Sequence, residues 1–276
     1  MSVLTAPPVT EAPNRPTPNP TPARPMALVR HSLALAQRSI IKIKRTPEQL
    51  MDVTLQPIIF VLLFVYIFGG AVAGSTHDYL EFVLPAIMVQ TVVFSSVSIG
   101  VNLNTDVDKG VFDRFRSLPI PRSAPLVGAV LGEVVRYAIS VAVLMGFGSL
   151  LGFRVATDPL SALAACLLVI LFALCMCWIS VYLGMVFRQP SAVQGVGFLL
   201  MFPLTFGSNM FVQTSSMPGW LQEWVKINPI THLVDAVRDL MLGGAVAVPV
   251  LEALAWGVGI VAVFAPLAVR AYRRKA

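Results

Sequence analysis

Long apolar stretches, separated by short polar segments, occupy most of the chain. A helix needs roughly 20 predominantly apolar residues to cross a bilayer, and six stretches reach or approach that length. The pattern therefore predicts an all-α integral membrane protein with six transmembrane helices. We expect these helices at residues 53–73, 80–103, 124–151, 160–186, 192–212 and 245–269.

The segment before the first span divides into two parts. Residues 1–25 are rich in Pro and Thr and have little to bury, which predicts a disordered tail. Residues 26–45 place apolar side chains on one helix face and basic side chains on the other. A basic amphipathic helix of this kind lies in the plane of the membrane surface, where it would contact lipids.

Two charged residues interrupt the third apolar stretch. Glu133 and Arg136 are three positions apart, so they share one side of a helix and could form an ion pair. They could also divide the stretch into two pieces. Because an ionised side chain at the bilayer centre costs about 2.5–3.5 kcal/mol, we expect both residues near the inner interface.

The segment at residues 105–122 is the longest strongly charged interruption between apolar stretches. Thr105, with Asp108 three residues later, is typical of a helix start, and Pro119 would end the helix. The apolar residues of this segment recur at helical spacing, at Val107, Val111, Phe112, Phe115 and Leu118. Two interpretations follow: a helix that rests on the lipid surface, or a rigid docking element for a soluble partner.

The long segment between the fifth and sixth stretches also has helical spacing. Trp220 and Trp224 suit the headgroup layer of a membrane, and an apolar helix face extends from Pro229 to Gly243. We therefore predict a broken, re-entrant pair of half-helices in the outer leaflet before the last span.

Polar and aromatic side chains share one side of the second and fifth stretches, at intervals of three or four residues. They are Gln90, Phe94, Ser98 and Asn102 in the second stretch, and Phe198, Phe202, Thr205 and Asn209 in the fifth. Polar groups on a membrane helix face protein or water rather than lipid. They either line a substrate path or hold neighbouring helices together, and the residues alone leave both hypotheses open.

Composition and charge agree with a membrane protein. Hydrophobic residues make up 56% of the chain and charged residues 12%, whereas soluble domains carry about 25% charged residues. The net charge of +6 does not indicate nucleic acid, because most of the 20 Lys and Arg residues lie in the amino-terminal segment, the 105–122 loop and the carboxyl-terminal tail. The positive-inside rule then places that loop and both termini in the cytoplasm.

Residues for catalysis or cofactor binding are not apparent. The phosphate-cradling pattern GxxxxGK[ST] is missing, so we do not expect the chain to hydrolyse ATP. Its three His and three Cys residues show no metal-site spacing. We therefore predict that this chain is not an enzyme and holds no cofactor or metal.

Three blocks of sequence resemble type-2 ABC-exporter permeases, in particular the daunorubicin-type, antibiotic-resistance branch found in actinobacteria. The resemblance extends over residues 26–274, and the order and spacing of the blocks are kept. The blocks are LQPIIFVLLFVYIFGGA, then DRFRSLPIPRSAPLVGAVLGE, then PLTFGSNMFV followed by MPGWLQEWVKINPITHLVDAVRDLMLGG.

The resemblance implies a multi-pass plasma-membrane permease whose transmembrane domain covers residues 26–276. It implies export of amphipathic compounds, drug-like or lipid-like, along a path lined by the second and fifth spans. It also implies a partner ATPase that holds ATP and Mg, and either a homodimer or a second permease subunit. The ATPase would dock on a coupling helix in the 105–122 loop, with the residues Asp106, Gly110, Val111, Phe112, Arg114, Phe115 and Arg116. Asp108 is an equal candidate for the acidic position assigned to Asp106.

Two other function classes remain open from the residues alone. An integral-membrane enzyme that modifies lipids would need convergent His, Asp or Glu side chains at one interface, and Glu133 with Arg136 gives little support for one. A secondary transporter would show an inverted repeat or a buried proton-relay carboxylate, and neither is apparent.

Overall fold

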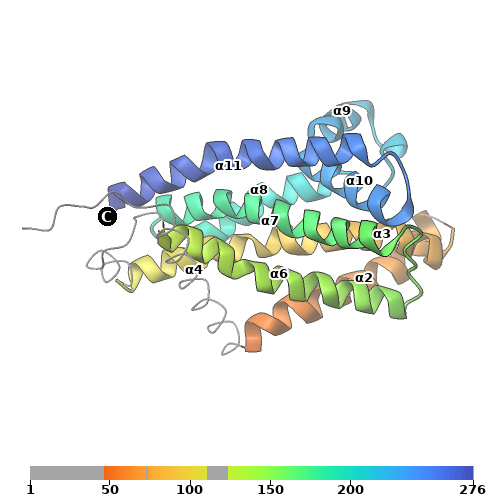
Figure 1. Cartoon of the computed structure of the whole chain (residues 1–276), viewed down its shortest axis with the longest axis horizontal. Coiled ribbons are helices and arrows are strands. Elements are labelled where there is room, and N and C mark those ends of the chain that lie inside the picture. The colour runs from red at the N-terminus through yellow and green to blue at the C-terminus, as the bar shows by residue number, and fades with distance from the viewer. Residues whose placement is uncertain (1–46, 73, 111–123, 276) are drawn as a thin grey trace, which may run out of the picture.

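The computed structural model describes residues 47–72, 74–110 and 124–275. Within these ranges every regular element is a helix, and Figure 1 shows the long helices packed side by side, with α9 and α10 at one end of the bundle. The elements are α2 (Pro47–Val72), α3 (Thr76–Ser95), α4 (Val97–Asp108), α6 (Ala124–Leu150), α7 (Pro159–Val186), α8 (Pro190–Phe206), η1 (Thr214–Ser216), α9 (Gly219–Ile227), α10 (Pro229–Leu242) and α11 (Ala247–Lys275).

The helical fold confirms the all-α prediction. Four helical segments are long and apolar enough to cross a membrane: Thr76–Asp108, Pro125–Leu150, Pro159–Val186 and Ala247–Arg274. Two shorter apolar helices, Thr54–Gly70 and Pro190–Phe206, coincide with the first and fifth predicted spans. Each predicted stretch is therefore helical over most of its length.

The fifth predicted span, 192–212, is too long at its carboxyl end. Helix α8 ends at Phe206, and Gly207 donates its backbone N–H to the Pro203 carbonyl as the chain leaves the helix. The Ser208 hydroxyl donates to the Thr205 carbonyl. The apolar pattern continues past Phe206 because the next residues are buried by neighbouring helices, not because they are helical.

The second predicted span, 80–103, is divided into α3 and α4 at Ser96. Helix α4 then continues through Thr105 to Asp108, so the predicted helix start at Thr105 is wrong. The Thr105 hydroxyl donates to the Val101 carbonyl one turn earlier (2.9 Å), as serine and threonine do inside helices. Helix α4 therefore begins within the second predicted span and extends into the 105–122 segment, which is predicted to dock a partner.

The third stretch is one helix, α6, and is not divided. The ion pair predicted within it is confirmed, with Arg136 Nη2 2.6 Å from Glu133 Oε2. Both residues lie near the middle of α6, and their position near the inner membrane interface stays a prediction. Buried charged groups in proteins are paired, and each of these two residues provides a partner for the other.

Helices α4 and α7 approach each other closely through glycine. A Cβ atom on Gly100 would collide with the Ser180 carbonyl oxygen, and one on Gly184 would collide with the Gly100 carbonyl oxygen. The Asn104 amide donates to the carbonyls of Gly184 (2.9 Å) and Phe187 (2.8 Å). Small residues let two membrane helices approach until their backbones touch, so α4 is held firmly against α7.

Replacing Gly100 with alanine should therefore lower the free energy of unfolding by about 1–3 kcal/mol, because the added methyl group meets rigid backbone. The thermal midpoint of the purified protein in detergent measures the change. Gly146→Ala in α6 is the matched control, since a Cβ there meets nothing within 4 Å and alanine has the higher helix propensity. Equal midpoints for the two variants would contradict this packing.

The predicted pair of helices before the last span is present as α9 and α10. Asn228 joins them, and its side chain makes contacts in two directions. Its Oδ1 accepts the Ile230 N–H (2.9 Å), which caps the start of α10. Its Nδ2 donates to the carbonyls of Leu204 (2.8 Å) and Gly207 (3.0 Å) at the end of α8. One amide thus connects three helix ends.

Candidate functional site

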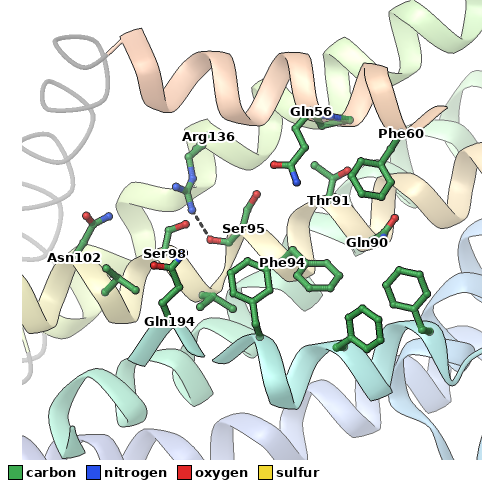
Figure 2. A pocket seen from close by; sticks show the side chains of 16 residues that line it. Gln56, Phe60, Gln90, Thr91, Phe94, Ser95, Ser98, Asn102, Arg136 and Gln194 are labelled. Carbon is green, nitrogen blue, oxygen red and sulfur yellow. Dashed lines mark hydrogen bonds between the residues drawn. The ribbon is translucent and has the colours of Figure 1, made fainter. Parts of the chain in front are cut away.

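A cavity of about 510 Å³ lies among α2, α3, α4, α6 and α8. Figure 2 shows its walls, with the side chains of the five helices directed inward. Its lining residues are Gln56, Pro57, Phe60, Gln90, Thr91, Phe94, Ser95, Val97, Ser98, Val101, Asn102, Arg136, Gln194, Phe198, Phe202 and Phe206. A cavity of this size can hold a drug-sized molecule.

The predicted stripe of the second stretch lines one wall of this cavity: Gln90, Phe94, Ser98 and Asn102. The stripe continues across the division between α3 and α4 because Ser96 keeps helical backbone angles (φ −64°, ψ −20°). The four-residue interval therefore holds on both sides of Ser96, and all four side chains reach the same space.

Only part of the predicted stripe of the fifth stretch lines the cavity. Phe198 and Phe202 line the cavity, and the Phe202 ring stacks on Phe206 with centroids 4.4 Å apart. Thr205 is buried and donates to the Met201 carbonyl of its own helix (2.8 Å). Asn209 lies beyond α8 and donates to Asp235 Oδ1 (2.7 Å). The last two residues therefore do not line this cavity.

The lining residues that sequence reasoning missed include Gln56, Phe60, Arg136 and Gln194. Gln194 lies four residues before Phe198, so the helical stripe of α8 could have been extended to it. Gln56 is a polar residue within an apolar stretch. Phe60 and Arg136 had no signal that separates a cavity wall from helix packing, since this depends on which helices become neighbours.

The cavity has an amphipathic lining. Asn102, Ser98, Gln194 and Arg136 gather toward the end of the cavity where α4 leads to the 105–122 loop (Figure 2). Aromatic rings extend along α8 away from that end, and Phe94 of α3 meets Phe198 of α8 with centroids 5.4 Å apart. An aromatic molecule with a polar edge would match both parts of the lining.

Among the residues that the structure describes, Arg136 is the one charged residue that lines the cavity. It is only 3% exposed, and its Nη2 donates to the Ser95 carbonyl (2.6 Å) at the end of α3. The same nitrogen lies 2.6 Å from Glu133 Oε2. Two contacts from different helices thus fix the guanidinium group at the cavity wall.

Among the residues that the structure describes, no three His, Cys, Asp or Glu side chains gather as metal ligands.

Comparison with known proteins agrees with this architecture. The family model described as "ABC-2 type transporter" matches residues 30–242. The chain belongs to the ABC-2 type transporter family. It is 45% identical over 254 residues to the daunorubicin resistance ABC transporter permease protein DrrB1 of Streptomyces coeruleorubidus, which covers 92% of this chain and 89% of that protein.

More distant relatives carry related names. The probable doxorubicin resistance ABC transporter permease protein DrrC of Mycobacterium tuberculosis is 27% identical over 220 residues, 79% of each chain. A putative transport permease, ycf38, of Cyanophora paradoxa is 27% identical over 216 residues, 77% of this chain and 74% of that one. The resemblance that the three sequence blocks predicted is confirmed.

The ABC-2 type transporter family implies an ABC ATPase partner, and the resemblance of the sequence predicts its docking site in the 105–122 loop. Asp106 lies in the last turn of α4, and Gly110 follows that helix with a positive φ of 66°. A glycine readily takes up this conformation where a helix ends. The other predicted coupling residues lie outside the described residues: Val111, Phe112, Arg114, Phe115 and Arg116.

Proposed function

We propose that this chain is the membrane-spanning permease subunit of an ATP-driven exporter of aromatic amphipathic compounds, drug-like or lipid-like. The observation that carries the proposal is the cavity, whose lining combines amide, hydroxyl and guanidinium groups with phenylalanine rings. The resistance-permease names of the relatives support it.

The proposed arrangement in the plasma membrane has six crossings and both termini in the cytoplasm. The distribution of Lys and Arg supports this orientation. The end of α4 and the carboxyl end of α11 also lie at the same end of the bundle (Figure 1). Residues 26–45 would rest on the inner leaflet, residues 1–25 would form the tail before them, and α9 with α10 would enter the outer leaflet.

The proposed partners follow from the same arrangement. An ABC ATPase, which supplies the ATP and Mg, would dock on the 105–122 loop. A second copy of the chain or a second permease would complete the transmembrane unit. The substrate path would include Gln90, Phe94, Ser98, Asn102, Phe198 and Phe202, while Thr205 and Asn209 would fix the outer ends of its walls.

Helix α4 offers a direct mechanical link between docking site and cavity. Val97, Ser98, Val101 and Asn102 line the cavity, and the same helix ends at Asp108, within the 105–122 segment. Because α4 is held against α7 through Gly100 and Asn104, the two helices would move together. Movement of the loop by the ATPase would therefore change the shape of the cavity.

A bulky side chain in the cavity should narrow the range of exported compounds. Ser98→Phe would fill space at the polar end, so large aromatic compounds should lose about tenfold or more in transport while small ones are retained. ATP-driven uptake of a size-graded series of fluorescent aromatic compounds into inside-out vesicles measures this. Ser149→Phe is the control, because Ser149 is exposed on α6 and does not line the cavity. If transport falls equally for compounds of all sizes, the polar and aromatic side chains of the second and fifth stretches hold helices together and do not line a substrate path.

A further inference from the structure

We propose that Gln90 is a specificity-determining residue, whose side-chain amide exchanges two hydrogen bonds with the transported compound. The ligand class is an aromatic compound whose edge carries a neutral donor beside a neutral acceptor, as in a lactam or a carboxamide. The inference rests on the proposed function and deepens it, because it names a chemical feature that the cavity selects.

The first observation is a buried amide without a partner. Gln90 is only 5% exposed, and within the described part of the chain its amide makes no hydrogen bond. A glutamine amide offers two N–H donors and an acceptor oxygen, and buried polar groups are nearly always hydrogen-bonded. A glutamine that held two helices together would bond to the neighbouring helix, so helix packing does not explain this one.

The second observation is that the amide is accessible from the cavity. Gln90 lines the cavity, and neither its oxygen nor its nitrogen is among the fully enclosed, unpartnered atoms of the described ranges. Figure 2 shows the side chain beside Phe60 and Thr91. The Thr91 hydroxyl already donates to the Ile87 carbonyl of its own helix (2.8 Å), so Gln90 supplies the free donors at this point of the wall.

Gln90 lies far from the polar groups that gather near Arg136. It precedes Asn102 by twelve residues along α3 and α4, which separates the two by about 18 Å along the helix axis. Figure 2 shows them at opposite ends of the row that also holds Phe94 and Ser98. A compound that meets Gln90 with its edge would therefore lie with its rings against Phe94 and leave the groups near Arg136 free for a further polar substituent.

The surroundings of Gln90 favour a neutral group on the ligand. The lining near it includes the rings of Phe60 from α2 and Phe94 from its own helix, and an unpaired charge among apolar groups costs far more than a hydrogen-bonded neutral group. A lactam presents an N–H and a C=O side by side, which match Oε1 and Nε2 of Gln90. A compound without the N–H would leave the Gln90 oxygen unpaired, and a site built for a hydrogen bond rejects such an analogue.

The experiment uses two planar probes of nearly equal shape, the lactam phenanthridinone and its lactone counterpart benzocoumarin, in which an oxygen atom replaces the N–H. Equilibrium dialysis against the purified permease–ATPase complex gives both affinities for the native chain and for Gln90→Met. Methionine is unbranched like glutamine and close to it in size, but it has no amide. We expect Gln90→Met to weaken the binding of phenanthridinone by about tenfold or more and not to weaken that of benzocoumarin.

A control variant and a second measurement make the test specific. Gln213→Met, at an exposed position outside the cavity, should bind both probes like the native chain. The thermal midpoint without any compound distinguishes recognition from packing. Because Gln90→Met removes a buried amide that has no partner in the described chain, the midpoint should stay the same or rise, whereas the loss of a packing contact would lower it.

The outcomes separate the two proposals. If the native complex binds both probes and Gln90→Met changes neither, weakens both alike or lowers the midpoint, the role of Gln90 is overturned while the exporter function stands. If the native complex binds neither probe, the cavity does not accept aromatic compounds, and both proposals fall.

Discussion

Replacing Arg238 with methionine is expected to lower the free energy of unfolding by about 3–5 kcal/mol, because it removes one partner of a buried polar network. Arg238 Nε donates to the Phe82 carbonyl (3.0 Å), and Nη2 donates to the carbonyls of Asn209 (3.1 Å) and Met210 (2.9 Å). These acceptors belong to α3 and to the segment after α8, while Arg238 belongs to α10. One side chain therefore joins three parts of the chain.

Electrostatic contacts add to this network. Arg238 Nη1 lies 3.7 Å from Asp235 Oδ1, and the guanidinium carbon lies 3.8 Å from the centre of the Phe82 ring. Burial lowers the pKa of Arg238 to about 10, and the negative charges of Asp235 and Asp239 oppose that shift. At neutral pH the group stays charged, so methionine removes both the charge and the donors.

The thermal midpoint of the purified permease in detergent measures this effect. Arg154→Met is the matched control, because Arg154 is exposed in the loop between α6 and α7, and an exposed arginine contributes little. A large drop for Arg238→Met and none for Arg154→Met is expected. Equal midpoints would show that water replaces Arg238 at the three carbonyls.

Replacing Phe115 with aspartate is expected to weaken ATPase binding by about 100-fold or more. The sequence predicts Phe115 on the apolar stripe of a docking helix, and the residue lies outside the described part of the chain. An unpaired carboxylate buried in an apolar cleft of a partner costs several kcal/mol, about 3 at least, and each 1.4 kcal/mol is roughly a tenfold loss of affinity. Membrane insertion should be unaffected, because the loop lies outside the apolar stretches.

Co-purification of the ATPase with the permease, at matched expression, tests this prediction. Ser117→Asp is the control, since it adds the same charge to the opposite side of the predicted helix. The Phe115 variant should lose the ATPase and substrate-stimulated ATP hydrolysis, and the control should keep both. If both variants keep the ATPase, the alternative interpretation is right, and the apolar stripe of the loop rests on the lipid surface.

The positions of the helices could be predicted from the sequence because the constraint is local. In a membrane every backbone N–H and C=O must be satisfied within the protein, which a helix achieves with bonds four residues apart. A sufficiently long apolar stretch therefore indicates a helix without knowledge of its neighbours. The Glu133–Arg136 pair was predictable for the same reason, since both partners lie on one turn of α6.

The cavity was predictable only in part. The stripe from Gln90 to Asn102 follows from helical periodicity, which survives the division at Ser96. Thr205 and Asn209 follow the same periodicity in the sequence, yet α8 ends at Phe206 and their hydrogen bonds lead elsewhere. Periodicity gives the side of a helix on which a residue lies, but not the length of the helix or what that side meets.

The sequence by itself thus determined an all-helical chain, the positions of its long apolar helices and its family resemblance, because each depends on a run of nearby residues. Tertiary structure decided which helices enclose the cavity, that Arg136 reaches the Ser95 carbonyl 41 residues away, and that Arg238 reaches the Phe82 carbonyl 156 residues away. Contacts over such separations form only when helices pack, and packing depends on the shapes of all the neighbouring side chains together. No single stretch of sequence holds that information.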